Sequence, residues 1–180
     1  MKILLGVTGS VAAILTPKLV SALKDLNAEI KVIATQRGLF FFDKNQLNVP
    51  VQTDKDEWPE TGYLKNSPVL HIDLGDWADI FLIAPLTADT LSDIAHGKAD
   101  KFLTSTVLAW PHSKPIIIAP AMNTKMWENP ITQGNIITVT RNYNIKMVQP
   151  IEGDLACGTH GIGAMARIES IIKEVSAYIR

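Results

Sequence analysis

The chain has 180 residues, a hydrophobic content of 47% and a formal net charge of −1 at pH 7. The net charge is close to zero and the basic residues are scattered along the chain, which argues against a nucleic-acid partner. The N-terminal apolar run ends at Gly6 and is too short for a signal peptide or a membrane span. The lone cysteine, Cys157, excludes an internal disulfide and a multi-cysteine zinc site, so we expect no metal. These properties predict one cytoplasmic domain over residues 1–180 with a substantial core.

Short apolar runs alternate with helical patterns along the chain, which is typical of a parallel sheet with helices on both faces. The sequence therefore predicts a three-layer α/β fold of the Rossmann-like, flavodoxin-like kind. The strands are expected at Lys2–Val7, Glu29–Thr35, Ile80–Ala84, Pro115–Ala119 and Ile145–Val148. The helices are expected at Ser10–Leu26, Ala88–His96, Asp100–Ala109, Pro130–Thr140 and Ile168–Ile179.

The first strand opens into a helix through the turn Gly6–Ser10. Backbone N–H groups and the Ser10 hydroxyl at such a helix start suit a phosphate, although an ordinary tight turn explains the same residues almost as well. The third glycine of a dinucleotide-binding fingerprint is missing, and the second strand ends in Ala34–Arg37 without an acidic residue for a ribose. A mononucleotide such as FMN therefore fits better than NAD.

Pro17 lies inside the first expected helix. It either kinks that helix or follows Thr16, which then caps a new turn. The segment Phe40–Ser67 reads as a long excursion, which in a compact domain is usually functional or mobile. Beyond it, His71 lies in an apolar stretch that fits a strand or a short helix. A lone histidine in such surroundings is more often structural than catalytic.

Small and hydroxyl residues follow the strand at Ile80–Ala84, in the loop Pro85–Thr90. Such a loop lets a flat ring approach the backbone and supplies hydrogen-bond donors, although Thr87 also suits a plain helix N-cap. Gly97 is expected just after the end of the following helix, and Asp100 is expected to cap the next one.

The stretch Pro120–Pro130 holds amide, thioether and indole groups directly after a buried strand. Ligands of open α/β sheets bind beyond the carboxyl ends of such strands, so this stretch predicts a binding site. Met122, Met126 and Trp127 recur at helical spacing and also suit a core. Asn123 is a poor helix-interior residue and a versatile donor and acceptor, which favours a functional role.

Glycines crowd the segment Gly153–Met165, with four of them in eleven residues. We therefore expect a mobile loop without helix or strand. It carries the only thiol, Cys157, with His160 nearby. A cysteine on such a segment suits a group that is delivered to a substrate when a lid closes.

Six motifs of the chain resemble those of the homo-oligomeric flavin-containing cysteine decarboxylases, in that family's order and over nearly the whole length. The motifs are Ser10–Ile14, Leu70–Ile72, Trp77–Asp79, Ile83–Thr90, Pro120–Trp127 and Leu155–Gly158.

The resemblance implies three catalytic residues. His71 matches the family's active-site base, Asn123 the amide that binds the substrate carboxylate and the decarboxylation intermediate, and Cys157 the proton donor of the second half-reaction. In this chemistry FMN oxidises the carbon–sulfur unit of a cysteine derivative to a thioaldehyde, so that the electrons released with CO₂ flow into sulfur.

The resemblance also implies the binding residues. Those for FMN are Gly9, Ser10, Val11, Thr35, Phe41, Thr87, Ala88, Asp89, Thr90 and Ala121. Those for the substrate are Asn123, Met126, Ala156 and Met165. Asp89 departs from the family's asparagine: if it is ionised, it loses a donor and repels the reduced, anionic flavin.

Substrate and assembly are implied in the same way. The family's substrates include 4'-phosphopantothenoylcysteine, a precursor in coenzyme A biosynthesis, and peptides that end in cysteine, and Leu155–Met165 favours the former. The family forms homotrimers, in some members assembled into dodecamers, with FMN at subunit boundaries. Trp110, Trp127 and Phe40–Phe42 offer apolar surface for such an interface. A flavin prenyltransferase and a non-catalytic flavin-binding regulatory subunit are further alternatives.

Overall fold

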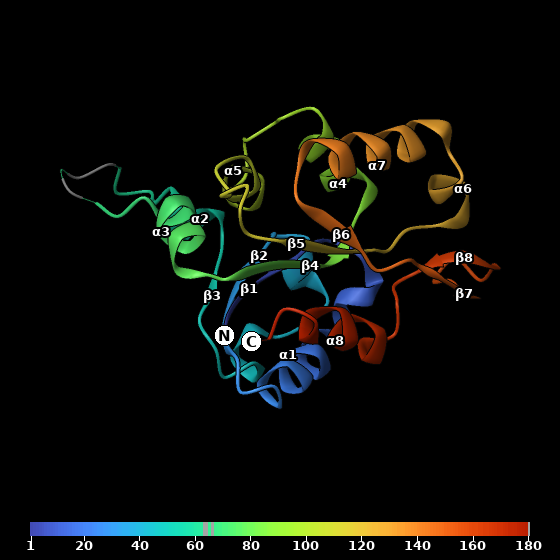
Figure 1. Cartoon of the computed structure of the whole chain (residues 1–180), viewed down its shortest axis with the longest axis horizontal. Helices are drawn as coiled ribbons and strands as arrows, with labels where there is room; N and C mark the ends of the chain where they lie inside the picture. Colours follow the sequence, from blue (N-terminus) through green and yellow to red (C-terminus); the bar gives the residue numbers. More distant parts are fainter. Residues whose placement is uncertain (63–64, 66, 180) are drawn as a thin grey trace.

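The computed structural model describes residues 1–62, 65 and 67–179. Among them, six strands form one parallel sheet in the order β3-β2-β1-β4-β5-β6, shown in Figure 1. The strands are β1 (Lys2–Val7), β2 (Glu29–Ala34), β3 (Val51–Gln52), β4 (Ile80–Leu86), β5 (Ile116–Pro120) and β6 (Ile145–Met147).

This strand order is that of the Rossmann fold. When the two-residue strand β3 is left aside, the remaining order is that of the flavodoxin-like fold, so the predicted fold class is confirmed. The order reverses between β1 and β4, and ligands of such sheets bind at the carboxyl ends of the strands at this switch point.

Helices cover both faces of the sheet (Figure 1). Along β1, Ile3 and Leu5 face a core shared with α1 (Thr16–Lys24) and α8 (Ile168–Ser176), whereas Leu4 faces the opposite core. That opposite core is shared with α3 (Leu70–Trp77), α4 (Ala88–Ala95), α5 (Phe102–Leu108) and α7 (Pro130–Asn142). Because both faces are buried, the central strands are continuously apolar, as the sequence indicated.

The expected first helix consists of two elements. The 3₁₀ helix η1 (Val11–Leu15) precedes α1, which begins at Thr16. Pro17 lies in the first turn of α1, where a missing N–H removes no intrahelical hydrogen bond. Thr16 is therefore the first helical residue rather than the cap, and the helix boundary accommodates the proline.

The prediction that Asp100 caps the next helix is wrong. The N-cap of α5 is Lys101, and the Phe102 N–H donates to Asp54 Oδ1 at 2.7 Å. Asp100 pairs instead with Lys98 at 2.8 Å. A carboxylate 48 positions earlier in the chain thus takes the place of the local one. Gly97 follows α4 with φ of +65°, as predicted.

The excursion Phe40–Ser67 contains short elements that the sequence did not reveal. They are the end of η2 (Gly38–Phe40), η3 (Lys44–Gln46), the edge strand β3 and α2 (Asp54–Glu57). The stretch around His71, left open between strand and helix, is the helix α3. Within the described ranges, no helix is both long and apolar enough to cross a membrane.

The prediction of an irregular loop over Gly153–Met165 is also wrong. This segment holds most of an antiparallel hairpin of β7 (Ile151–Asp154) and β8 (His160–Ala164), apart from the main sheet (Figure 1). Glycines usually mark breaks in regular structure, but in this hairpin they allow a close approach to neighbouring backbone.

Candidate active site

Two cavities contain most of the predicted site residues. The first, of about 510 Å³, is mainly apolar and extends from η1 to the β7–β8 hairpin. The second, of about 310 Å³, is lined by side chains of both charges. Adjacent residues of the turn after β1 line different cavities, because Ser10 belongs to the first and Gly9 to the second.

The predicted residues divide between these cavities. The first is lined by Ser10, Val11, Ala121, Asn123, Ala156, Cys157 and Met165. The second is lined by Gly9, Thr35, Asp89 and Thr90. Neither lining includes His71, Phe41, Thr87, Ala88 or Met126.

Thr8 connects the two loops that meet at the switch point. Its buried hydroxyl donates to the Pro85 carbonyl at 2.8 Å and accepts from the Thr87 N–H at 2.9 Å. The turn after β1 and the loop after β4 are therefore held to each other through one side chain. Sequence reasoning missed Thr8, because a threonine after a strand carries no signal of a partner 77 positions away.

Gly9 brings the loops after β1 and β2 together. A Cβ atom on Gly9 would lie 2.4 Å from Cβ of Arg37, a distance that excludes any side chain there. Nearby, the Thr35 hydroxyl accepts from the Gly38 N–H at 3.1 Å. The Ser10 hydroxyl accepts from the Ala12 N–H at 3.3 Å and so caps η1.

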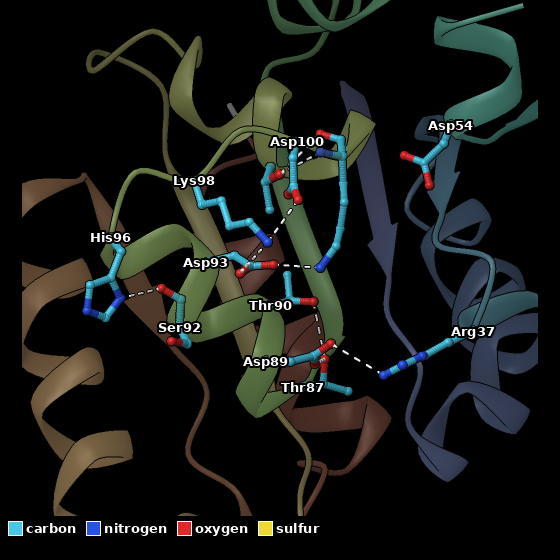
Figure 2. Close-up of polar contacts among 12 residues, drawn as sticks. Arg37, Asp54, Thr87, Asp89, Thr90, Ser92, Asp93, His96, Lys98 and Asp100 are labelled. Atoms are coloured by element: carbon cyan, nitrogen blue, oxygen red, sulfur yellow. Dashed lines mark hydrogen bonds and ion pairs between the residues drawn. The ribbon is translucent and has the colours of Figure 1, made fainter.

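Asp89 lines the second cavity, and Figure 2 shows its carboxylate turned toward Arg37. Its carboxylate accepts from the Thr87 hydroxyl and lies 4.0 Å from the guanidinium of Arg37. Partial burial raises the pKa of Asp89, but hydrogen bonds from Thr87 and Thr90, with the charges of Lys101 and Arg37, outweigh it and lower the pKa. Asp89 is therefore ionised at neutral pH.

Thr87 occupies the N-cap position of α4, but its hydroxyl does not cap the backbone. It donates to Asp89 and lies 3.2 Å from the Thr90 hydroxyl. A plain capping role therefore does not account for this residue, and the loop forms a hydroxyl and carboxylate cluster at the end of β4 (Figure 2).

Asn123 and Cys157 meet at the first cavity. Asn123 is the N-cap of α6 (Thr124–Trp127), and its Oδ1 accepts from the Lys125 N–H at 2.9 Å. The same side chain donates through Nδ2 to Cys157 Sγ at 2.9 Å. The capping bond fixes the orientation of the amide, so its NH₂ group is the part that faces the thiol.

Cys157 lies at the exposed tip of the hairpin. The Thr159 hydroxyl is 3.0 Å from its sulfur. This hydrogen bond, with further ones from the Thr159 backbone and from Asn123, lowers the pKa of Cys157 and outweighs the opposing effect of burial. His160, by contrast, pairs with Asp154 at 2.9 Å and with Glu152 at 4.0 Å.

Glycines dock the hairpin against the strand exit after β5. The Met122 N–H donates to the Gly163 carbonyl at 2.9 Å. A Cβ atom on Gly163, whose φ is +135°, would lie 2.2 Å from the Met122 carbonyl oxygen, and one on Gly161 would lie 2.5 Å from Thr124 Oγ1. This close approach places Cys157 beside Asn123.

The three residues that suited a core interpretation have different environments. Trp127 is buried in the core, Met122 lines the first cavity, and Met126 is 48% exposed on α6. Phe41 is half-buried against the α1 side of the sheet, with its ring centroid 5.2 Å from that of Phe40.

The structure does not bring His71 to Asn123 and Cys157 within one chain. His71 belongs to α3 at one end of the molecule's long axis, and the hairpin lies at the other end (Figure 1). His71 Nδ1 lies 2.5 Å from Glu57 Oε1, and its backbone N–H donates to Glu57 Oε2 at 3.1 Å. Glu57 was not identified from the sequence.

A family model described as Flavoprotein matches residues 1–180. The chain belongs to the Flavoprotein family. A phosphopantothenoylcysteine decarboxylase of Mus musculus is 41% identical to this flavoprotein over 179 residues, which are 99% of this chain and 87% of the relative.

Two solved structures are similar to this flavoprotein throughout. A cysteine-to-serine mutant of PPC decarboxylase, complexed with pantothenoylaminoethenethiol, matches with a TM-score of 0.93 at 41% identity, over 98% of this chain and 97% of that one. The FMN binding protein AtHal3 matches with a TM-score of 0.88 at 41% identity, over 98% of this chain and 95% of that one.

Proposed function

We propose that this flavoprotein is a phosphopantothenoylcysteine decarboxylase, which uses FMN to convert 4'-phosphopantothenoylcysteine into 4'-phosphopantetheine and CO₂ for coenzyme A biosynthesis. The observation that carries the proposal is the pairing of the Asn123 amide with the Cys157 thiol, 2.9 Å apart, at an apolar cavity beside the carboxyl end of β5. The mouse relative and the PPC decarboxylase structure support the choice of reaction.

The residues at the carboxyl ends of β1, β2 and β4 fit FMN. Gly9 lets the loops after β1 and β2 meet closely, because a side chain there would clash with Arg37, and Thr8 holds the loop after β4 beside them. The residues that would hold FMN are Gly9, Ser10, Val11, Thr35, Phe41, Thr87, Ala88, Thr90 and Ala121, together with Asp89, whose ionised carboxylate would supply no hydrogen-bond donor to the flavin. When bound, FMN supplies an acceptor for two electrons of the substrate's carbon–sulfur unit and later returns them, so that sulfur becomes the sink for the electrons left by CO₂.

Asn123 binds the substrate carboxylate through its NH₂ group. Its Oδ1 already accepts from the Lys125 N–H, and one of the two N–H groups of the amide donates to Cys157 Sγ, so the second N–H is the donor left for a carboxylate in the cavity. Met126, Ala156 and Met165 complete the substrate-binding residues. The mainly apolar lining lowers the local polarity, which strengthens the hydrogen bond from the amide to a carboxylate.

Cys157 donates the proton of the second half-reaction. Its hydrogen bond with Thr159 and its lowered pKa make the thiol a better acid than an ordinary cysteine. The compound in the mutant PPC decarboxylase structure is an ethenethiol, which is the product expected when decarboxylation proceeds and the final protonation fails.

His71 serves as the base from a neighbouring copy of the chain, in a homotrimer that in turn forms a dodecamer in some members. Two observations support this part of the proposal. His71 lies far from its own Cys157, and α3 exposes the apolar side chain of Ile72 beside it. Phe40, 85% exposed, adds apolar surface, whereas Trp110 and Trp127 are buried and are not available for an interface. We place the assembly in the cytoplasm.

One variant of Asn123 and a matched variant of Asn129 test the proposal. Asn123→Asp keeps a capping side chain for α6 but repels the substrate carboxylate, so turnover should fall by about 10²-fold or more. Asn129→Asp is the matched control, because Asn129 caps α7 in the same way, accepting from the Ile131 N–H at 2.9 Å. Normal CO₂ release by Asn123→Asp would contradict the assigned role.

Cys157→Ser separates the two half-reactions. This variant should release CO₂ from phosphopantothenoylcysteine but form a product lighter than 4'-phosphopantetheine by two hydrogen atoms, which mass spectrometry detects. Full formation of the saturated thiol would remove Cys157 from the mechanism. A peptide ending in cysteine, assayed in parallel, tests the alternative substrate, and the absence of CO₂ from both would support a regulatory subunit.

A further inference from the structure

We propose that Glu57 is the positioning residue of His71: it holds the imidazole through Nδ1 and leaves Nε2 as the basic nitrogen. The inference rests on the proposed function, which gives His71 the role of active-site base. It adds a residue from the excursion before α3 to the machinery of the reaction.

Both carboxylate oxygens of Glu57 contact His71. Oε1 lies 2.5 Å from His71 Nδ1, and Oε2 accepts from the His71 backbone N–H at 3.1 Å. The Glu57 side chain is 5% exposed and that of His71 26% exposed. The carboxylate is therefore nearly withdrawn from water, whereas part of the imidazole stays accessible to a reactant.

The chemistry of a carboxylate decides which nitrogen carries the proton. An ionised carboxylate only accepts hydrogen bonds, so a neutral imidazole beside it carries its proton on Nδ1. The lone pair is then on Nε2, the nitrogen that is free to take a proton from a substrate. The second bond, to the backbone, stops the carboxylate from rotating away.

The helix that carries Glu57, α2, is fixed at its N-terminal end. Asp56 accepts from the Thr53 N–H at 2.7 Å and caps the helix. Asp54 accepts from the Phe102 N–H of α5 at 2.7 Å and lines the second cavity together with Arg37; both side chains are labelled in Figure 2. One helix of four residues thus links the proposed cofactor site to His71.

An isosteric substitution tests this assignment sharply. Glu57→Gln has one oxygen and one NH₂ group where Glu57 has two oxygens. The backbone N–H of His71 can only donate, so it donates to the amide oxygen of the new glutamine. The NH₂ group of the glutamine then faces Nδ1 and donates to it. The imidazole proton should then move to Nε2, and the base is lost. Glu57→Asp retains two acceptor oxygens and should retain the Nδ1–H form.

¹⁵N NMR of the FMN-loaded protein, labelled with ¹⁵N in histidine, shows which nitrogen of His71 carries the proton and requires no activity assay. His71→Asn identifies the signals. We expect the Nδ1–H tautomer of His71 in the unmodified protein and in Glu57→Asp, and the Nε2–H tautomer in Glu57→Gln. An Nε2–H tautomer in the unmodified protein, or no change of tautomer in Glu57→Gln, overturns the proposal. The tautomer of the unmodified protein can be determined without a Glu57 variant.

Kinetics provide the second reading. Glu57→Gln should lower kcat by about 10²–10⁴-fold with little change in KM, since a base is lost and substrate contacts are not. Glu60→Gln, an acid-to-amide change three residues later at a side chain that is 92% exposed, is the control and should leave the tautomer and kcat as they are. If His71→Asn is fully active, the base assigned in the proposed function fails. If His71→Asn is inactive while Glu57→Gln keeps its kcat, only the inference about Glu57 fails.

Discussion

Strand β4 and the β7–β8 hairpin both lead to predicted site residues, yet they are held in different ways. All seven residues of β4 are buried, and the strand pairs with β1 on one side and β5 on the other. The hairpin has two strands of mostly exposed or half-buried residues. The loop after β4, which we propose holds FMN, thus follows directly from a core strand, whereas Cys157 depends on a peripheral element.

A hairpin of two strands is marginally stable by itself in water. Its position here follows from two close contacts, of Gly163 with the backbone of Met122 and of Gly161 with the side chain of Thr124. Damage to β4 should therefore unfold the protein, whereas damage to the hairpin should affect the site and leave the fold. The following predictions test this difference, from the largest effect to the smallest.

Phe81→Ala should cause the largest loss. The Phe81 side chain is fully buried in β4, with its ring centroid 5.1 Å from that of Trp110. Its removal leaves a cavity between sheet and helices, and the free energy of unfolding should fall by about 3–5 kcal/mol. Urea unfolding followed by circular dichroism measures this, and Phe81→Leu, which retains more volume, should lose less.

Gly163→Ala should disturb the hairpin alone. The added Cβ meets the Met122 carbonyl at a φ of +135°, a strain of about 1–3 kcal/mol that is relieved by movement of the hairpin. Hydrogen exchange should rise across β7 and β8 but not in β4, and the saturated thiol product should decrease. Gly134→Ala is the control, because a Cβ there meets open space. Equal exchange in the two variants would contradict the separation of hairpin and sheet.

Thr159→Val should have the smallest effect, confined to one titration. Loss of the Thr159 hydroxyl removes the largest cause that lowers the Cys157 pKa, so the pKa should rise and the thiolate should form at higher pH. The pH profile of alkylation by iodoacetamide should shift to higher pH, while Thr159→Ser, which keeps the hydroxyl, should retain the original profile. Unfolding by urea should be unchanged in both.

The sequence predicted those elements whose signal is local. β1, β4 and β5 were recognised because runs of branched apolar residues suit strands buried on both faces. The hairpin was mistaken for a loop, because glycine carries the same local signal whether it breaks a strand or admits a close neighbour.

Local sequence signals were equally insufficient to predict the contacts of the candidate site. Asn123 and Cys157 were singled out for their residue types and for a family resemblance, and their contact at 2.9 Å was not visible from 34 positions of separation. Thr8 and Glu57 were not identified at all. Each acts through hydrogen bonds to residues distant in the chain, and the neighbouring sequence contains no pattern that indicates these bonds.

The sequence by itself determined the alternation of strands and helices, the buried faces and the kinds of side chain at the strand ends, because these depend on hydrophobic periodicity and local backbone preference. Only the tertiary structure decided which of these ends meet, which carboxylate holds which partner, and that His71 and Cys157 lie apart in one chain. Such pairings depend on packing between segments far apart in the sequence, and that geometry arises only when the chain folds.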